Sequence, residues 1–149
     1  MSNPSSYIVL VAKCFEDDTV LSGMIDYIIP GYRRALADDS LTGTNHACIG
    51  VRTLNLRGET TGGSEYHGIS KFDQLIEISV THKSDNDTYI SAIEAEIIRV
   101  VSKRLTKTIG GVAYSVKTDG NINFTPVNDP VFLDRVEVTG TCRLKYLDT

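Results

Sequence analysis

The stretch KFDQLIEISVTH, residues 71–82, decides the fold. Apolar and polar residues alternate along it with a period of two, which is typical of a β-strand with one buried and one exposed face. The apolar face comprises Phe72, Ile76, Ile78 and Val80. The polar face comprises Glu77, Ser79 and Thr81. A sheet built from such strands needs a second layer that covers its apolar face.

The segment before this strand predicts its hairpin partner. Residues 47–57 favour a strand in which Ile49 and Val51 share one face, whereas Leu54 and Leu56 have the other phase. A bulge near Thr53, or burial of both faces, explains the switch. Residues 58–69 contain four glycines and almost no apolar side chain. We therefore expect a long antiparallel hairpin whose two strands are joined by a mobile arm.

A long amphipathic helix is predicted next, from the N-cap candidates Ser84, Asp85 and Asp87 to about Lys107. Its apolar residues recur every three or four positions. They are Ile90, Ile93, Ile97, Val101 and Leu105, with Val100 beside them. Acidic residues lie in its first half and basic residues in its last half, which complements the helix dipole. Gly110-Gly111 is expected to end the helix.

The C-terminal third predicts further strands. Residues 112–117 favour a short strand, and Asp119-Gly120 is a strong hairpin signal from which residues 122–125 return. The last strand is predicted over residues 133–147. Its apolar face comprises Val136, Val138, Cys142, Leu144 and Tyr146, and its polar face comprises Arg135, Glu137, Thr139, Thr141, Arg143 and Lys145. Gly140 interrupts the apolar face and suggests a bulge.

The N-terminal region favours two helices before the first strand. Ile8, Val11, Ala12 and Phe15 form one helical face, and Asp18 or Thr19 can cap a short second helix that is followed by a turn at Pro30-Gly31. Residues 33–45 favour a loop. The chain as a whole, residues 1–149, predicts a single α+β domain. We expect a two-layer sandwich: a mainly antiparallel sheet of about four strands with a long β-hairpin arm, covered by one long helix and the N-terminal helices.

Composition narrows the classes of protein. The 149 residues are 41% hydrophobic and 23% charged, with a formal net charge of −4, which is typical of a globular domain and not of a dedicated nucleic-acid binder. No apolar run reaches the roughly 18 residues of a membrane helix, and no signal peptide is recognisable. Three widely spaced cysteines suit buried thiols in a reducing cytoplasm.

A search for catalytic chemistry finds no motif. The histidines lack metal-ligand spacing, Gly62-Gly63 is not a phosphate loop, and no nucleophile elbow occurs. We therefore expect no catalytic, metal-binding or cofactor-binding residue, and no enzymatic activity. One alternative stays open: a small α+β hydrolase or ligand-binding domain with a pocket beside His46, Cys48 and His82.

Charged side chains on predicted surfaces are the candidates for contacts with partners. The basic run of residues 99–107 can touch phosphate or an acidic partner, although a solvated helix end explains it as well. The candidate assembly residues are Glu65 and Tyr66 on the arm, Glu77 on the hairpin, Arg99 and Arg104 on the long helix, and Arg143 and Lys145 on the last strand.

The order of these elements resembles that of bacteriophage tail terminator, or tail completion, proteins. A first helix is followed by VLSGMI at residues 20–25 and YIIP at residues 27–30. A strand, an arm and the strand FDQLIEISV at residues 72–80 come next, and a long helix and the final strand VEVTGTCRL at residues 136–144 complete the pattern. The similarity extends from about Tyr7 to Tyr146. It concerns the order of the elements and the general character of their sequences.

This resemblance implies a structural virion protein of the tail or neck, assembled in the host cytoplasm. Tail terminators form six-fold rings at the head-proximal end of the tail tube, stop tube polymerisation and present a face to the head. The expected partners are other copies of the chain in a homo-hexameric ring, the tail tube protein, and a head–tail connector or head-closure protein. DNA passes through such a ring without specific binding, and no membrane is involved. A head-closure or connector-adaptor neck protein is the nearest alternative.

Overall fold

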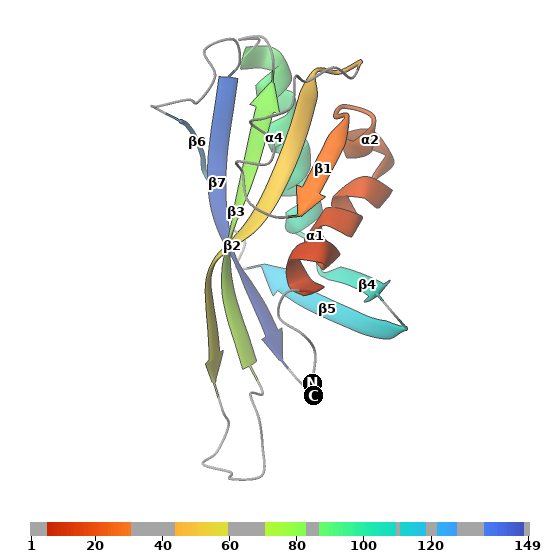
Figure 1. Cartoon of the computed structure of the whole chain (residues 1–149), viewed down its shortest axis with the longest axis vertical. Coiled ribbons are helices and arrows are strands. Elements are labelled where there is room, and N and C mark those ends of the chain that lie inside the picture. The colour runs from red at the N-terminus through yellow and green to blue at the C-terminus, as the bar shows by residue number, and fades with distance from the viewer. Residues whose placement is uncertain are drawn as a thin grey trace.

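The computed structural model (Figure 1) describes residues 6–30, 44–59, 71–82, 87–109, 111–118, 122–127 and 136–147. Three helices and seven strands lie within these ranges. In chain order they are α1 (Ser6–Asp17), α2 (Thr19–Ser22), β1 (Tyr27–Pro30), β2 (Ala47–Glu59), β3 (Lys71–His82), α4 (Asp87–Val101), β4 (Leu105–Ile109), β5 (Val112–Thr118), β6 (Phe124–Pro126) and β7 (Val136–Leu147). The loop expected at residues 33–45 and the arm beyond residue 59 fall mostly outside the described residues.

The strands form one mixed sheet in the order β1-β2-β3-β7-β5-β4, with β6 paired to β7. Every described pairing is antiparallel except that of β1 with β2. The α+β class is confirmed. The expected two-layer sandwich of about four strands is wrong, because the sheet has more strands and curls into a half-barrel. The additional strands β1 and β4 come from segments in which the sequence favoured a helix or a turn.

The long hairpin is confirmed, including its bulge. β2 and β3 pair antiparallel from Ala47 opposite His82 to Glu59 opposite Lys71. The register shifts between Thr53 and Asn55, so Leu54 is the additional residue of a bulge. Leu54 is accordingly 40% exposed, while Ile49 and Val51 are buried. The register of the strand therefore shifts next to Thr53, where the sequence suggested a bulge.

The long helix is shorter than predicted, because α4 ends at Val101 and Leu105 belongs to a strand. The hydroxyl of Thr118 on β5 donates a hydrogen bond to the carbonyl of Val101 at 2.5 Å, which satisfies one acceptor at the helix end. Leu105 is still buried, opposite Val116 of β5. Of the two glycines that were expected to stop the helix, Gly111 instead immediately precedes β5 and has a φ of +80°, whereas Gly110 lies outside the described residues.

The core is one cluster of apolar side chains between the helices and one face of the sheet. The predicted helix stripe is confirmed, since Ile90, Ile93, Ile97 and Val101 are all buried in this cluster. The sheet contributes Ile76, Ile78, Val80, Val138 and Leu144. From α1 the cluster takes Leu10, Val11 and Phe15, and from α2 it takes Leu21. The N-terminal helices therefore cover the same sheet face as α4.

β7 has the predicted alternation but not the predicted bulge. Its register with β3 is continuous through Gly140, which lies opposite Ile78. On the other edge of β7, β6 pairs Phe124 with Gly140, so residues 124–126 return to β7 and not to β5. A Cβ atom on Gly140 would lie 3.0–3.1 Å from Ile122, Asn123 and Phe124. The glycine is therefore needed for close packing, not for a change of register.

Candidate assembly surfaces

The polar face of the sheet carries an ion pair between neighbouring strands. Arg52 of β2 and Glu77 of β3 lie directly opposite each other. Arg52 Nε donates to Glu77 Oε1 at 2.8 Å and Arg52 Nη2 to Oε2 at 3.3 Å. The Glu77 side chain is only 12% exposed. Glu77, predicted as an assembly residue, therefore binds a partner within its own chain, and this pairing fixes the local geometry of β2 on β3.

Arg99, a second predicted assembly residue, joins α4 to α2. Its Nη2 donates to Asp18 Oδ1 at 2.6 Å and its Nε to Glu96 Oε2 at 2.5 Å. Asp18 Oδ1 also accepts a hydrogen bond from the backbone N–H of Leu21 at 2.9 Å, so Asp18, one of the two predicted candidates, is the N-cap of α2. The hydrogen bond from Arg99, followed by that from Leu21, lowers the pKa of Asp18. Reversing the charge of Arg99 would thus disturb folding as well as any contact with a partner.

The Asp18–Arg99 pair predicts a pH-dependent contribution to stability. Because the pKa of Asp18 is lowered in the folded state, its contribution is present above the ordinary aspartate pKa and is lost as the pH falls through the folded value. Asp18→Asn keeps an N-cap acceptor but removes the charge. We expect the variant to lose about 0.2–1 kcal/mol at pH 7, and we expect this difference from the native protein to shrink as the pH falls below the ordinary pKa of aspartate.

Urea unfolding across this pH range measures the difference. Lys107 Nζ lies 2.5 Å from Asp17 Oδ2, and this contact lowers the pKa of Asp17 in the same direction. Asp17 is present in both proteins, so the difference between them isolates Asp18. A gap between the two proteins that stays constant from pH 7 to pH 2 would contradict the assignment.

Two other predicted basic residues, Arg104 and Lys145, lie near a third basic residue, Lys117, on one side of the sheet. Lys117 of β5 lies directly opposite Lys145 of β7. Arg104 immediately precedes β4, and its Nε donates to the hydroxyl of Ser115 on β5, two residues from Lys117. We call Arg104, Lys117 and Lys145 the basic row; all three are exposed. Arg143, half-buried, lies two residues from Lys145 on the same face of β7.

The basic run at residues 99–107 is therefore not one charged helix surface. Arg99 and Lys107 form ion pairs within the chain, whereas Arg104 lies after the end of α4 and belongs to the basic row. Sequence reasoning missed Lys117. The signal that could have found it is the alternation of Val116 and Lys117 in a predicted strand, but no sequence pattern pairs β5 with β7.

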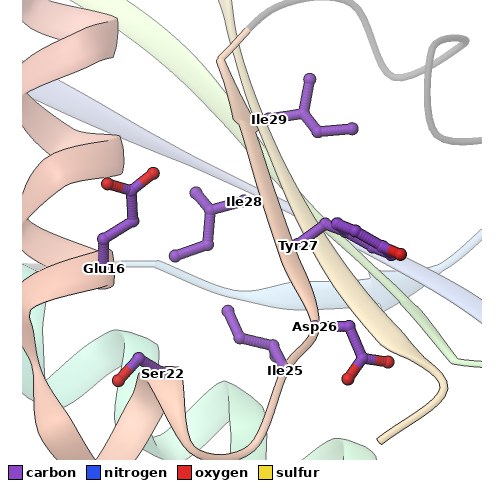
Figure 2. Close-up of a pocket in the computed structure, with 7 residues that line it drawn as sticks. All are labelled: Glu16, Ser22, Ile25, Asp26, Tyr27, Ile28 and Ile29. Atoms are coloured by element: carbon purple, nitrogen blue, oxygen red, sulfur yellow. The ribbon is translucent and has the colours of Figure 1, made fainter. Parts of the chain in front are cut away.

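An open pocket of about 350 Å³ lies along the outer strand β1. Figure 2 shows Ile28 pointing towards α1, while Tyr27 and Ile29 point to the other side of the strand. Its other lining residues are Glu16, Ser22, Ile25 and Asp26. Asp26 holds the start of β1 against β2, since its N–H donates to the carbonyl of Ala47 at 2.8 Å and its Oδ1 accepts from the N–H of Asn45 at 3.0 Å.

The histidines and the cysteine considered for a chemical site do not share one location. His82 lies opposite Ala47, so it is on the core face, where its ring centroid is 5.0 Å from that of Tyr89. Cys48, the next residue of β2, faces the other side of the sheet and packs against Ile29. His46 precedes β2 with a φ of 52°. The pocket of Figure 2 contains none of the three, and no group of metal-binding side chains occurs in the described ranges.

Two comparisons of the sequence with known proteins were made. No protein-family model matches the chain, and no curated protein matches it in sequence.

Of the predicted assembly residues, Glu65 and Tyr66 lie outside the described residues. Within the described ranges, none of the helices has the length and apolar character needed to cross a membrane.

Proposed function

We propose that this chain is a structural virion protein of the tail terminator kind, as its sequence resemblance implies. In this proposal several copies, six in the resembled family, form a ring at the head-proximal end of a phage tail tube. The ring stops tube growth and offers a joint to the head connector. The order of the helices and of the two long hairpin strands along the chain supports the proposal.

The observation that carries the proposal is the long, partly unpaired β2 strand. β1 pairs only with residues Cys48–Val51 of β2. From Arg52 to Glu59, no described strand pairs with the outer edge of β2, and this is the part that runs past the helices in Figure 1. Free backbone N–H and C=O groups on a sheet edge pair readily with another chain. An edge of one copy that meets a different surface of the next copy gives a heterologous contact, which closes into a ring when the rotation allows.

The bulge residue Leu54 provides a probe of this edge. It is 40% exposed, although it is a large apolar residue on a strand. Leu54→Glu is expected to weaken assembly with little effect on folding, because exposed substitutions usually change stability by less than about 0.5 kcal/mol. Ile98→Glu is the matched control, since Ile98 is 39% exposed on α4, away from β2.

The test combines the mass in solution with electron microscopy of tail tubes assembled in the presence of the chain. We expect a ring that caps each tube, a narrow distribution of tube length, and loss of both with Leu54→Glu but not with Ile98→Glu. Tubes whose ends and lengths are unchanged by the chain would overturn the proposal. A ring that binds the head connector but not the tube would replace it with the head-closure alternative.

A further inference from the structure

The strand β1 is much less buried than the strand that it pairs with. It has four residues, and none of them is fully buried. The four residues opposite them, Cys48–Val51 of β2, are all buried. Tyr27 at the start of β1 is 45% exposed, and Pro30 at its end has no N–H to donate to a neighbouring strand. β1 itself therefore adds little apolar area to the core.

The side of β1 that faces α1 is not closely packed. Ile28 points towards α1 (Figure 2), and the open pocket of about 350 Å³ is lined there by Ile28 together with Glu16 and Ser22. The pairing of β1 with β2 is parallel, unlike the antiparallel pairing of β2 with β3. Parallel pairing is slightly less stable per residue. Separating β1 from β2 therefore costs less free energy than separating β2 from β3.

Apart from the pairing with β2, the described hydrogen bonds of this segment lie before the first residue of β1. The N–H of Asp26 donates to the carbonyl of Ala47 at 2.8 Å. The hydroxyl of Tyr89 on α4 donates to the carbonyl of Met24 at 2.5 Å. Neither bond has to break when the following four residues leave β2. These bonds form a fixed point from which β1 can separate, beginning at its Pro30 end.

The release of β1 lengthens the free edge of β2. With β1 in place, no described strand pairs with this edge from Arg52 to Glu59. Without β1 the free edge begins at Cys48, so the backbone N–H and C=O groups of four more residues are available to another chain.

From this geometry we propose that β1 is a displaceable strand. It detaches from β2 while the rest of the sheet stays folded, and its release controls how much of the β2 edge a neighbouring copy can pair with. The control of assembly rests on the proposed function of the chain. The release itself does not, because it is a property of a single copy.

Hydrogen exchange of the backbone amides of the native chain, followed by NMR, tests the release. Along Cys48–Val51, alternate N–H groups point towards β1 and towards β3, so this segment contains both the test amides and their control. We expect protection factors at least about 100-fold lower for the amides that bond to β1, because a local opening costs less than global unfolding. Equal protection of the two sets would overturn the proposal.

A disulfide between β1 and β2 provides a lock. Position 27 lies opposite Cys48, and the spacing of neighbouring strands, about 4.8 Å, suits the Cα separation of a disulfide. Tyr27 lies on the same side of β1 as Ile29, against which Cys48 packs (Figure 2). Oxidised Tyr27→Cys is expected to raise the protection of the β1–β2 amides to within about ten-fold of the β2–β3 amides. The reduced variant, and Tyr27→Ser treated with the same oxidant, are expected to keep the low protection.

The mass in solution of the same samples reports the effect on assembly. We expect the reduced Tyr27→Cys chain and the Tyr27→Ser chain to form the ring, and the oxidised Tyr27→Cys chain to remain smaller. A locked chain that assembles as readily as the reduced chain would overturn the control of the β2 edge by β1. Low protection of the β1–β2 amides in a native chain that forms no ring would support the release but overturn the proposed function, and with it the control of assembly.

Discussion

Replacing Ile97 with alanine is expected to lower the free energy of unfolding by about 2–5 kcal/mol. Ile97 is fully buried on α4, in the same core cluster as Ile76 and Ile78 of β3. The truncation removes buried methyl groups and leaves a cavity that the surrounding residues fill only in part. A closely packed interior makes this cost large.

Ile98 provides a control for this prediction from the next position of the same helix. It is 39% exposed, so Ile98→Ala removes the same atoms from a site that is largely in water. We expect a change within about 0.5 kcal/mol, because alanine has the higher helix propensity and little packing is lost. Urea unfolding of both variants measures the difference. Equal losses for the two substitutions would contradict the packing of α4 on the sheet.

Replacing Gly140 with valine is expected to destabilise the protein by about 1–3 kcal/mol. Strand propensity alone predicts the opposite sign, since valine is favoured in strands and glycine is depleted. The carbonyl of Asn123 would lie 3.1 Å from the new Cβ atom, and the side chains of Ile122 and Phe124 are equally close. β6 must therefore move away from β7 to admit the larger side chain.

Thr139 is the control position for this effect. It neighbours Gly140 on β7 but points to the other face of the sheet, where it is half-buried. Thr139→Val keeps a β-branched side chain of similar shape, and we expect a change within about 0.5 kcal/mol. Thermal and urea unfolding check both variants. A stabilising Gly140→Val would mean that β6 does not press against this strand.

The hairpin and the buried stripe of α4 could be predicted because their signals are local. Alternation in residues 71–82 and the phase change at Leu54 each specify which side chains can be buried together. β4 could not be predicted in this way, because Leu105 fits the helical period of α4 and is buried in either arrangement. The segment forms a strand and not a further turn of α4, because it pairs with β5 and because Lys107 forms an ion pair with Asp17.

The candidate surfaces depended even more on long-range contacts. The sequence predicted Arg99 and Arg104 on one helix, but in the structure Arg99 pairs with Asp18 of the N-terminal region and Arg104 contacts Ser115 of β5. Similarly, Glu77 was predicted to be a surface charge and instead pairs with Arg52 across the strands. A charged side chain is available to a partner only if it does not already form an ion pair within its own chain. The sequence alone does not show which side chains form such pairs.

The sequence by itself determined the α+β class, the paired strands β2 and β3, and the buried face of α4, and it offered the bulge of β2 as one of two explanations for the change of phase. These features depend on periodicity and on residues close in the chain, where a face is either apolar or polar. The tertiary structure alone decided the curl of the sheet, the parallel pairing of β1 with β2, the closeness of β6 to Gly140, and the basic row. Each of these needs segments that are distant in the sequence to meet, and no local pattern specifies which strand edges will pair.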